Sequence, residues 1–254
     1  MSEIRILCEG FHDRAFWAGW LKHLGCSDDG FKPGTAGYPR RDPFGDFVRG
    51  EGQKAYHSPS GQFLRVMPCH GKAKILRAAE TRLVQRISKS LVRLIIAVDP
   101  DTLAGGPTVP TGLRTQDVLN FLQQQVDSSA ALNASKEIEI DGGATRISLI
   151  RWEVNDPPTA GVPNQQTLER LVCSALNAAY PARAQAVHNW LNARPVPPPS
   201  DPKEHAWSYM AGWYAEAGCE FFYENLWNDA NIVAELQSRL QASGAWTVAQ
   251  LIAS

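Results

Sequence analysis

A short apolar run that ends in two aspartates limits most strongly what this chain can fold into. The run Leu94–Val98 is rich in β-branched residues, and Asp99 and Asp101 follow it directly. Such a run is typical of a buried parallel strand in an α/β sheet. Ligands of open α/β sheets bind just beyond the carboxyl ends of the strands, so both aspartates are predicted at a site. The alternative is that Asp99–Thr102 is only a turn, since Asp and Pro favour turns.

A second group of acidic residues follows an earlier strand. Residues Ile4–Cys8 form a short apolar run, Glu9 follows it, and Asp13 starts a helical pattern. Because side chains alternate along a strand, Asp99 and Asp101 are expected to point the same way. Two carboxylates that close repel each other, and a divalent cation would relieve that repulsion. The plain alternative for Asp13 is a first-turn acid that complements the helix dipole.

Together, a Glu-Gly-x-x-Asp motif at Glu9 and an Asp-x-Asp motif at Asp99 resemble the Toprim domain family of topoisomerases, primases and OLD-type nucleases. The small OLD-nuclease-like Toprim proteins are the most similar, and the resemblance covers roughly residues 4–176. It implies a Rossmann-like, mainly parallel central sheet of about four strands flanked by helices. It also implies Mg²⁺ or Mn²⁺ ligands at four carboxylates, namely Glu9, Asp13, Asp99 and Asp101. All of these except Asp13 are also expected to take part in catalysis.

The resemblance adds one basic and one acidic residue. A Gly-Lys junction follows the second strand of OLD-like proteins, and here Lys72 follows the strand Phe63–Pro68. A catalytic lysine there would neutralise charge that develops on a phosphate. A Leu-Glu pair at the head of a later helix makes Glu169 a candidate ligand of a second metal ion. The structural alternatives are an exposed lysine and a dipole-stabilising glutamate, each in the first turn of a helix.

The segment Ser27–Gln62 contains four prolines and seven glycines but no sustained helical or strand period. We therefore expect a long loop inserted into the domain. Its basic residues are interleaved with aromatic ones, a mixture that can contact phosphates and stack on bases. Four residues are predicted to bind nucleic acid: Arg40, Arg41, Arg49 and Lys54. The alternative is a solvated loop with a few aromatic side chains packed on the domain.

The rest of the chain adds helices and one more strand. Helices are expected at residues 13–24, 73–89, 115–128, 167–179 and 231–243, and strands at 4–8, 63–68, 93–101 and 146–154. A proline-rich connector at Arg194–Pro202 precedes an aromatic-rich helical stretch at residues 206–224. We expect a Toprim-like α/β domain at residues 1–190 and a helical C-terminal extension at residues 191–254 packed on it. A helical stripe this aromatic favours core packing over base stacking.

Composition narrows the class of protein. The chain has 254 residues and a formal net charge of −1, which gives no general attraction to nucleic acid. Any nucleic-acid contact must therefore use a local basic patch or metal ions. Five scattered cysteines form no C-x-x-C pair, so neither a disulfide framework nor a zinc site is expected. No signal peptide and no apolar run near the ~20 residues of a membrane span are evident, which predicts a cytoplasmic protein without membrane partners.

Three functions compete. The predicted one is a Mg²⁺- or Mn²⁺-dependent OLD-like nuclease that cleaves DNA or RNA, alone or with a separate ATPase partner. The second is a weakly active or inactive Toprim-fold binding or regulatory subunit, whose aromatic helices dock another protein. The third is a phosphatase of the haloacid dehalogenase class, with an aspartyl nucleophile at Asp99-x-Asp101. Leu103 stands where that motif has Thr or Val, and Glu9 would be left unexplained.

Overall fold

The structure is a computed structural model, which describes residues 2–29, 52–84, 90–101, 113–157, 162, 164–197, 201–213 and 219–253. The strands are β1 (Glu3–Cys8), β2 (Ser27–Asp28), β3 (Lys54–His57), β4 (Phe63–Pro68), β5 (Leu91–Val98), β6 (Ala131–Leu132), β7 (Ile138–Ile140) and β8 (Thr145–Arg151). The α-helices are α1 (Phe11–His23), α2 (Lys72–Val84), α3 (Thr115–Gln125), α4 (Leu168–Ala179), α5 (Pro181–Asn192), α6 (Pro202–Ala211), α7 (Cys219–Asn225), α8 (Ala230–Ala242) and α9 (Ala245–Ala253). Two 3₁₀ turns, η1 (Asp141–Gly143) and η2 (Leu226–Asn228), complete the described elements.

Contacts within the chain divide it into two units. The sheet unit comprises Met1–Val98, Leu113–Ile150 and Val248–Ser254, and the helical unit comprises Asp99–Gly112 and Arg151–Thr247. The domain boundary expected after residue 190 lies inside α5 of the helical unit. None of the helices in the described ranges has the length and apolar composition that a membrane crossing requires.

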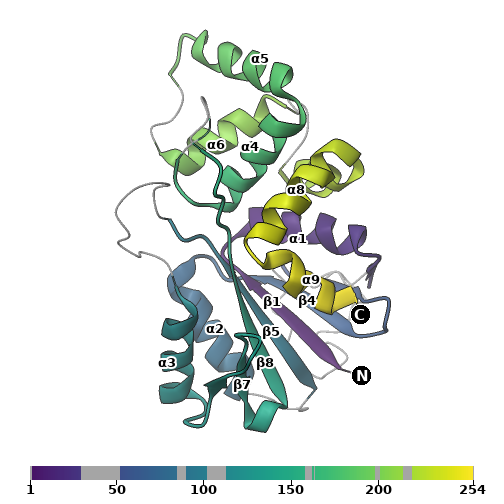
Figure 1. Ribbon diagram of the computed structural model, residues 1–254, viewed down its shortest axis with the longest axis vertical. Helices are drawn as coiled ribbons and strands as arrows, with labels where there is room; N and C mark the ends of the chain where they lie inside the picture. The colour runs from purple at the N-terminus through teal and green to yellow at the C-terminus, as the bar shows by residue number, and fades with distance from the viewer. Residues whose placement is uncertain are drawn as a thin grey trace, which may run out of the picture. The chain divides into compact units, whose positions relative to one another are not determined.

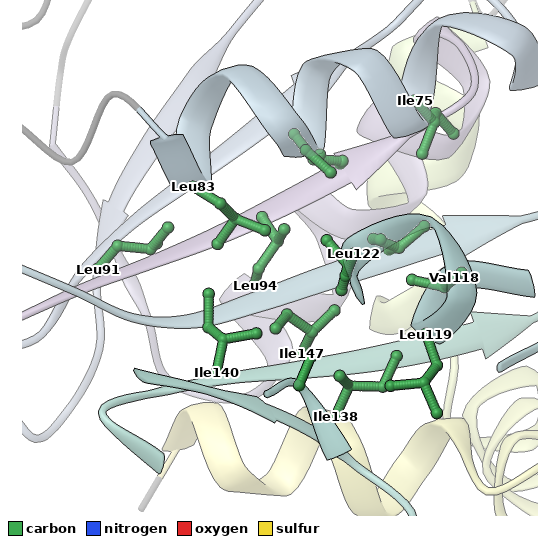
Figure 2. Packing of buried hydrophobic residues seen from close by; sticks show 14 of the residues in the cluster. Ile75, Leu83, Leu91, Leu94, Val118, Leu119, Leu122, Ile138, Ile140 and Ile147 are labelled. Carbon is green, nitrogen blue, oxygen red and sulfur yellow. The ribbon is translucent and has the colours of Figure 1, made fainter. Parts of the chain in front are cut away.

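The sheet unit carries one mixed sheet in the order β2-β3-β4-β1-β5-β8-β7-β6 (Figure 1). At its centre, β1 pairs in parallel with both β4 and β5, and every residue of β1 is buried. The first residues of β5 and β8 are joined by a bond from Thr145 Oγ1 to Leu91 O (2.9 Å), so both strands begin at the same end of the sheet. Figure 2 shows these two strands running in the same direction.

The α/β class and the flanking helices are confirmed, but a mainly parallel sheet of about four strands is not, because short antiparallel strands extend the predicted ones. The sheet has eight strands, and four of its six described pairings are antiparallel. The strands that the sequence did not predict, β2, β3, β6 and β7, are two to four residues long. Such short strands carry no readable period, because bonds to a neighbour distant in sequence hold them in place.

One face of the sheet packs against α2 and α3. Ile75 and Leu83 of α2 face the strands, and Val118 and Leu122 of α3 join them (Figure 2). Ala79, four residues from both Ile75 and Leu83, belongs to the same cluster. This spacing places them on one side of each helix. On the strands, the cluster contains Leu7, Met67, Leu91, Leu94, Ile96, Val98, Ile138, Ile140 and Ile147. Helix α1 packs against β3 and β4.

The predicted loop Ser27–Gln62 is only partly described. Its first two residues form β2, and β3 lies near its end, so Lys54 begins a strand instead of lying in a loop. The other residues predicted there to bind nucleic acid, Arg40, Arg41 and Arg49, lie outside the described residues.

The helical unit is built around α4, which packs against α5, α6 and α8. Its core is aromatic: the buried rings are Tyr209, Trp213, Phe222, Tyr223 and Trp227. The single helical stretch expected at residues 206–224 is two helices, α6 and α7. These buried aromatic side chains therefore serve as core, as their spacing favoured, whereas Phe221 is exposed.

Candidate functional site

The first junction of the site joins β1 to α1. Glu9 and Gly10 follow the strand, and the Gly10 N–H donates to Asp13 Oδ2 at 3.2 Å. Asp13 is buried and occupies the first turn of α1, where a carboxylate satisfies a free N–H group and complements the helix dipole. Burial raises the pKa of the neighbouring Cys8 thiol well above its usual value, and Asp13 and Glu9 add to that rise. Glu9 and Asp13 thus lie around the same strand end.

The second junction joins β4 to α2 and lies beside the first. The Cys69 N–H donates to Cys8 O at 2.8 Å, and the Gly71 N–H donates to Glu9 O at 2.9 Å. Between them the backbone is left-handed, with φ of 57° at His70 and 106° at Gly71. This turn brings Lys72 Nζ to 3.8 Å from Glu9 Oε1, and both side chains are partly exposed.

The third junction follows β5, whose last residue is Val98, and belongs to the helical unit. Asp99 Oδ1 accepts a bond from the Leu168 N–H at 2.8 Å, at the start of α4. The Asp101 N–H donates to Gln166 O at 3.0 Å, and Asp101 Oδ1 accepts from Gln165 Nε2 at 3.1 Å. The segment after β5 is therefore held on the residues that lead into α4.

The expected alternation of Asp99 and Asp101 does not apply. The strand ends at Val98, and Asp101 has a left-handed φ of 55°. The two-residue period of side chains requires extended backbone, so it says nothing about where Asp101 points. The two aspartates instead share a role, since each accepts a bond from the segment before α4 or from α4 itself.

Glu169 lies one residue after Leu168, so the structure brings it and the Asp99–Asp101 segment to the same helix start. Its side chain is 1% exposed, inside the helical unit. Burial raises the pKa of the Cys173 thiol well above its usual value, and the Glu169 carboxylate adds to that rise. Thr167 Oγ1 caps α4 by accepting the Arg170 N–H at 3.2 Å. Glu169 is thus a buried carboxylate one turn from a buried thiol.

The donor atoms suit a hard divalent cation, because carboxylate oxygens are what Mg²⁺ and Mn²⁺ prefer. Among the residues that the structure describes, no three His, Cys, Asp or Glu side chains form a group that could hold a metal ion. Mg²⁺ is usually bound by one or two carboxylates together with water and substrate phosphate oxygens. The residues present fit that mode of binding better than a cage made only of protein ligands.

Three residues close to Glu9 or Lys72 in the sequence were not predicted to belong to the site. Phe11, the first residue of α1, is 45% exposed. Arg14 and His70 both lie against its ring. A large aromatic residue directly after the Glu-Gly pair, on a helix whose later apolar positions already supply a core face, was the signal that could have revealed it.

Comparison with known proteins identifies a fold and no family. No family model matches the chain, and no curated protein matches it. The crystal structure of a hypothetical protein from Pyrococcus horikoshii OT3 is similar, with a TM-score of 0.63 over 100% of both chains and 16% sequence identity. At that identity the likeness shows a shared fold alone.

Proposed function

We propose that this protein is a Mg²⁺- or Mn²⁺-dependent nuclease that hydrolyses phosphodiesters of DNA or RNA, as the Toprim resemblance implies. One observation supports the proposal above all. Polar residues follow three neighbouring parallel strands: Lys72 comes after β4, Glu9 after β1 and Asp99 after β5. In open α/β sheets this is the edge where ligands bind.

The chain's own residues would divide the work. By the resemblance, four carboxylates would hold the cations: Glu9, Asp13, Asp99 and Asp101. A bound divalent ion would activate water and stabilise the leaving oxygen of a phosphodiester. Lys72 would bind a phosphate oxygen and neutralise charge that develops on it. Glu9, whose carboxylate is partly exposed, would accept a proton from water.

A second candidate is a binding or regulatory subunit with little or no activity. The observation that favours it is that these carboxylates already have structural partners. Asp13 and Asp99 each accept a backbone N–H at a helix start, and Glu9 pairs with Lys72. A haloacid-dehalogenase-type phosphatase has no such support, because Leu103 stands where its motif has Thr or Val and Glu9 would be left without a role.

Calorimetric titration with Mn²⁺ and with Mg²⁺, joined to cleavage assays in the same buffers, tests the proposal. Wild type is compared with Asp101→Asn, using plasmid DNA and RNA as substrates. The matched control is Asp28→Asn, which alters an exposed aspartate of β2. We expect the first substitution to lose both metal binding and cleavage, and the control to keep both.

Two other outcomes would contradict the proposed nuclease. Metal binding by wild type without cleavage of either substrate would favour the binding subunit. No metal binding by wild type would show that the carboxylates are structural and would remove the metal-dependent nuclease.

A further inference from the structure

We propose that Phe11, together with Arg14 and His70, forms a platform on which a base of single-stranded nucleic acid stacks. The inference rests on the proposed function, because it supplies the substrate contact beside Glu9 and Lys72. The two acidic motifs do not indicate which residues would contact a base of the substrate.

Phe11 differs from every other aromatic residue of its helix. It is 45% exposed, whereas Phe16, Trp17 and Trp20 of α1 are all 0% exposed. It comes two residues after Glu9, at the carboxyl end of β1. Nearly half of Phe11 is therefore accessible to a ligand.

Arg14 holds the ring from one side. Its guanidinium carbon lies 5.0 Å from the Phe11 ring centroid, within the range of a cation–π contact. Arg14 Nη1 donates to Gly52 O at 2.8 Å, which fixes the guanidinium in place. A Cβ added at Gly52 would lie 2.6 Å from Phe11 Cε1, and Gly52 has a φ of +87°. Only glycine therefore lets the chain approach the ring this closely.

His70 packs against the same ring from the next junction. The two ring centroids are 5.3 Å apart and the planes meet at 78°, an edge-to-face arrangement. His70 is exposed and adopts a left-handed backbone, which is uncommon for a residue with a side chain. Backbone in such regions occurs often at ligand sites. The ring is thus preorganised by two neighbours while nearly half of the residue stays open to solvent.

The neighbours of the ring favour a base over an apolar protein surface. The Arg14 guanidinium and the His70 imidazole contact the Phe11 ring. Lys72 follows His70 by two residues in the sequence. Cations beside an aromatic face are the combination that binds single strands, in which bases stack and phosphates meet positive charge. Because the whole chain carries a net charge of −1, attraction of nucleic acid depends on local cations. Arg14 and Lys72 are two such cations, and Lys72 pairs with Glu9.

Fluorescence anisotropy with a labelled 15-nucleotide oligo-dT, in EDTA so that cleavage cannot occur, tests the platform on the full-length protein. We expect Phe11→Ala to weaken binding by about 5- to 150-fold, which is the usual loss when one stacked base loses its aromatic partner. Phe11→Trp should keep or strengthen binding, and Phe11→Leu should weaken it although apolar area remains. The matched control is Phe221→Ala, since Phe221 is 61% exposed on α7.

An abasic oligonucleotide of the same length separates stacking from other contacts. Wild type and Phe11→Ala should bind it with equal affinity. An equal loss on the abasic and the normal strand would overturn stacking, as would unchanged binding by Phe11→Ala. Loss of binding by Phe11→Ala to a protein partner, with no binding of oligonucleotide by wild type, would assign the surface to protein recognition instead. Thermal melting of each variant confirms that it folds.

Failure of the platform can be told apart from failure of the proposed function. Cleavage of nucleic acid by wild type, with Phe11→Ala binding as wild type does, would overturn the platform and leave the nuclease standing. Oligonucleotide binding that depends on Phe11, with no cleavage in Mg²⁺ or Mn²⁺, would support the platform and overturn the nuclease.

Discussion

The two ends of the central strands hold the same kinds of charged residue in opposite environments. Near their amino ends, Arg5 and Glu3 of β1 form an ion pair whose side chains are 4% and 3% exposed. Arg65 of β4 is the parallel register partner of Arg5 and is also buried. Beyond the carboxyl ends, Lys72 and Glu9 are 3.8 Å apart, and their side chains are 19% and 12% exposed.

The difference shows how structural charges can be told from charges available to a ligand. Burial, with a smaller contribution from the adjacent Arg5, lowers the pKa of Arg65 to about 9, and Glu3 opposes both effects. The charged form of Arg65 is therefore costly, and the Glu3 carboxylate is needed to offset that cost. The Glu9–Lys72 pair has a longer separation and more exposed side chains, so a phosphate can compete with Glu9 for Lys72.

The largest expected effect belongs to the buried end. Glu3→Gln removes the carboxylate that faces Arg5 and Arg65, and breaking a buried pair in this way costs about 3–5 kcal/mol. Urea denaturation followed by circular dichroism measures the loss of unfolding free energy. A loss under about 1 kcal/mol would erase the contrast between the two strand ends.

Asp99 tests whether one carboxylate can both stabilise the fold and be available to a ligand. Asp99→Ala removes the acceptor of the Leu168 N–H, which should lower stability by about 1–2 kcal/mol, as loss of a helix cap does. Asp99→Asn keeps an oxygen acceptor and should recover most of that stability while cleavage stays absent. Cleavage by Asp99→Asn at the wild-type rate would make Asp99 purely structural.

His70 is expected to carry strain at the carboxyl end. His70→Gly removes the left-handed penalty and should raise stability by up to about 1 kcal/mol in thermal unfolding. Lys136→Gly is the matched control, because Lys136 has a φ of 61° outside the site. Both variants should gain stability, but His70→Gly alone should weaken oligonucleotide binding. Equal binding by the two would remove His70 from the platform.

The smallest stability change is expected at Glu9. Glu9→Gln should alter the unfolding free energy by no more than about 0.5 kcal/mol, because partly exposed pairs contribute little. Cleavage should nevertheless be lost. A stability loss as large as that of Glu3→Gln, measured in the same urea titration, would show that both strand ends are structural.

The long strands were predictable because their apolar runs are dense. The expected strand at residues 63–68 coincides with β4, and that at residues 4–8 lies within β1. Pairing was not predictable, since the meeting of Arg5 with Arg65 depends on a register between strands some sixty residues apart. The short strand β3 was hidden for the same reason, because its bonds to β4 hold it in place.

At the site, residue type was more predictable than geometry. The acid and lysine at the first two strand ends were expected from the Toprim resemblance, and the structure places Glu9 beside Lys72. The contact of Phe11 with His70 joins two junctions through the register of β1 with β4, which no local pattern encodes. The position of Asp101 depends on a left-handed residue, which the alternation rule does not cover.

The short outer strands have a consequence for how this protein behaves at high concentration. In the described part of the chain, the sheet order ends in β2 and β6, each two residues long. A sheet edge with many open N–H and C=O groups can recruit a strand from another molecule and begin aggregation. In β2 and β6 the row of open backbone groups is too short for such pairing. The eight-stranded sheet is therefore protected from adding a strand of another molecule at these edges.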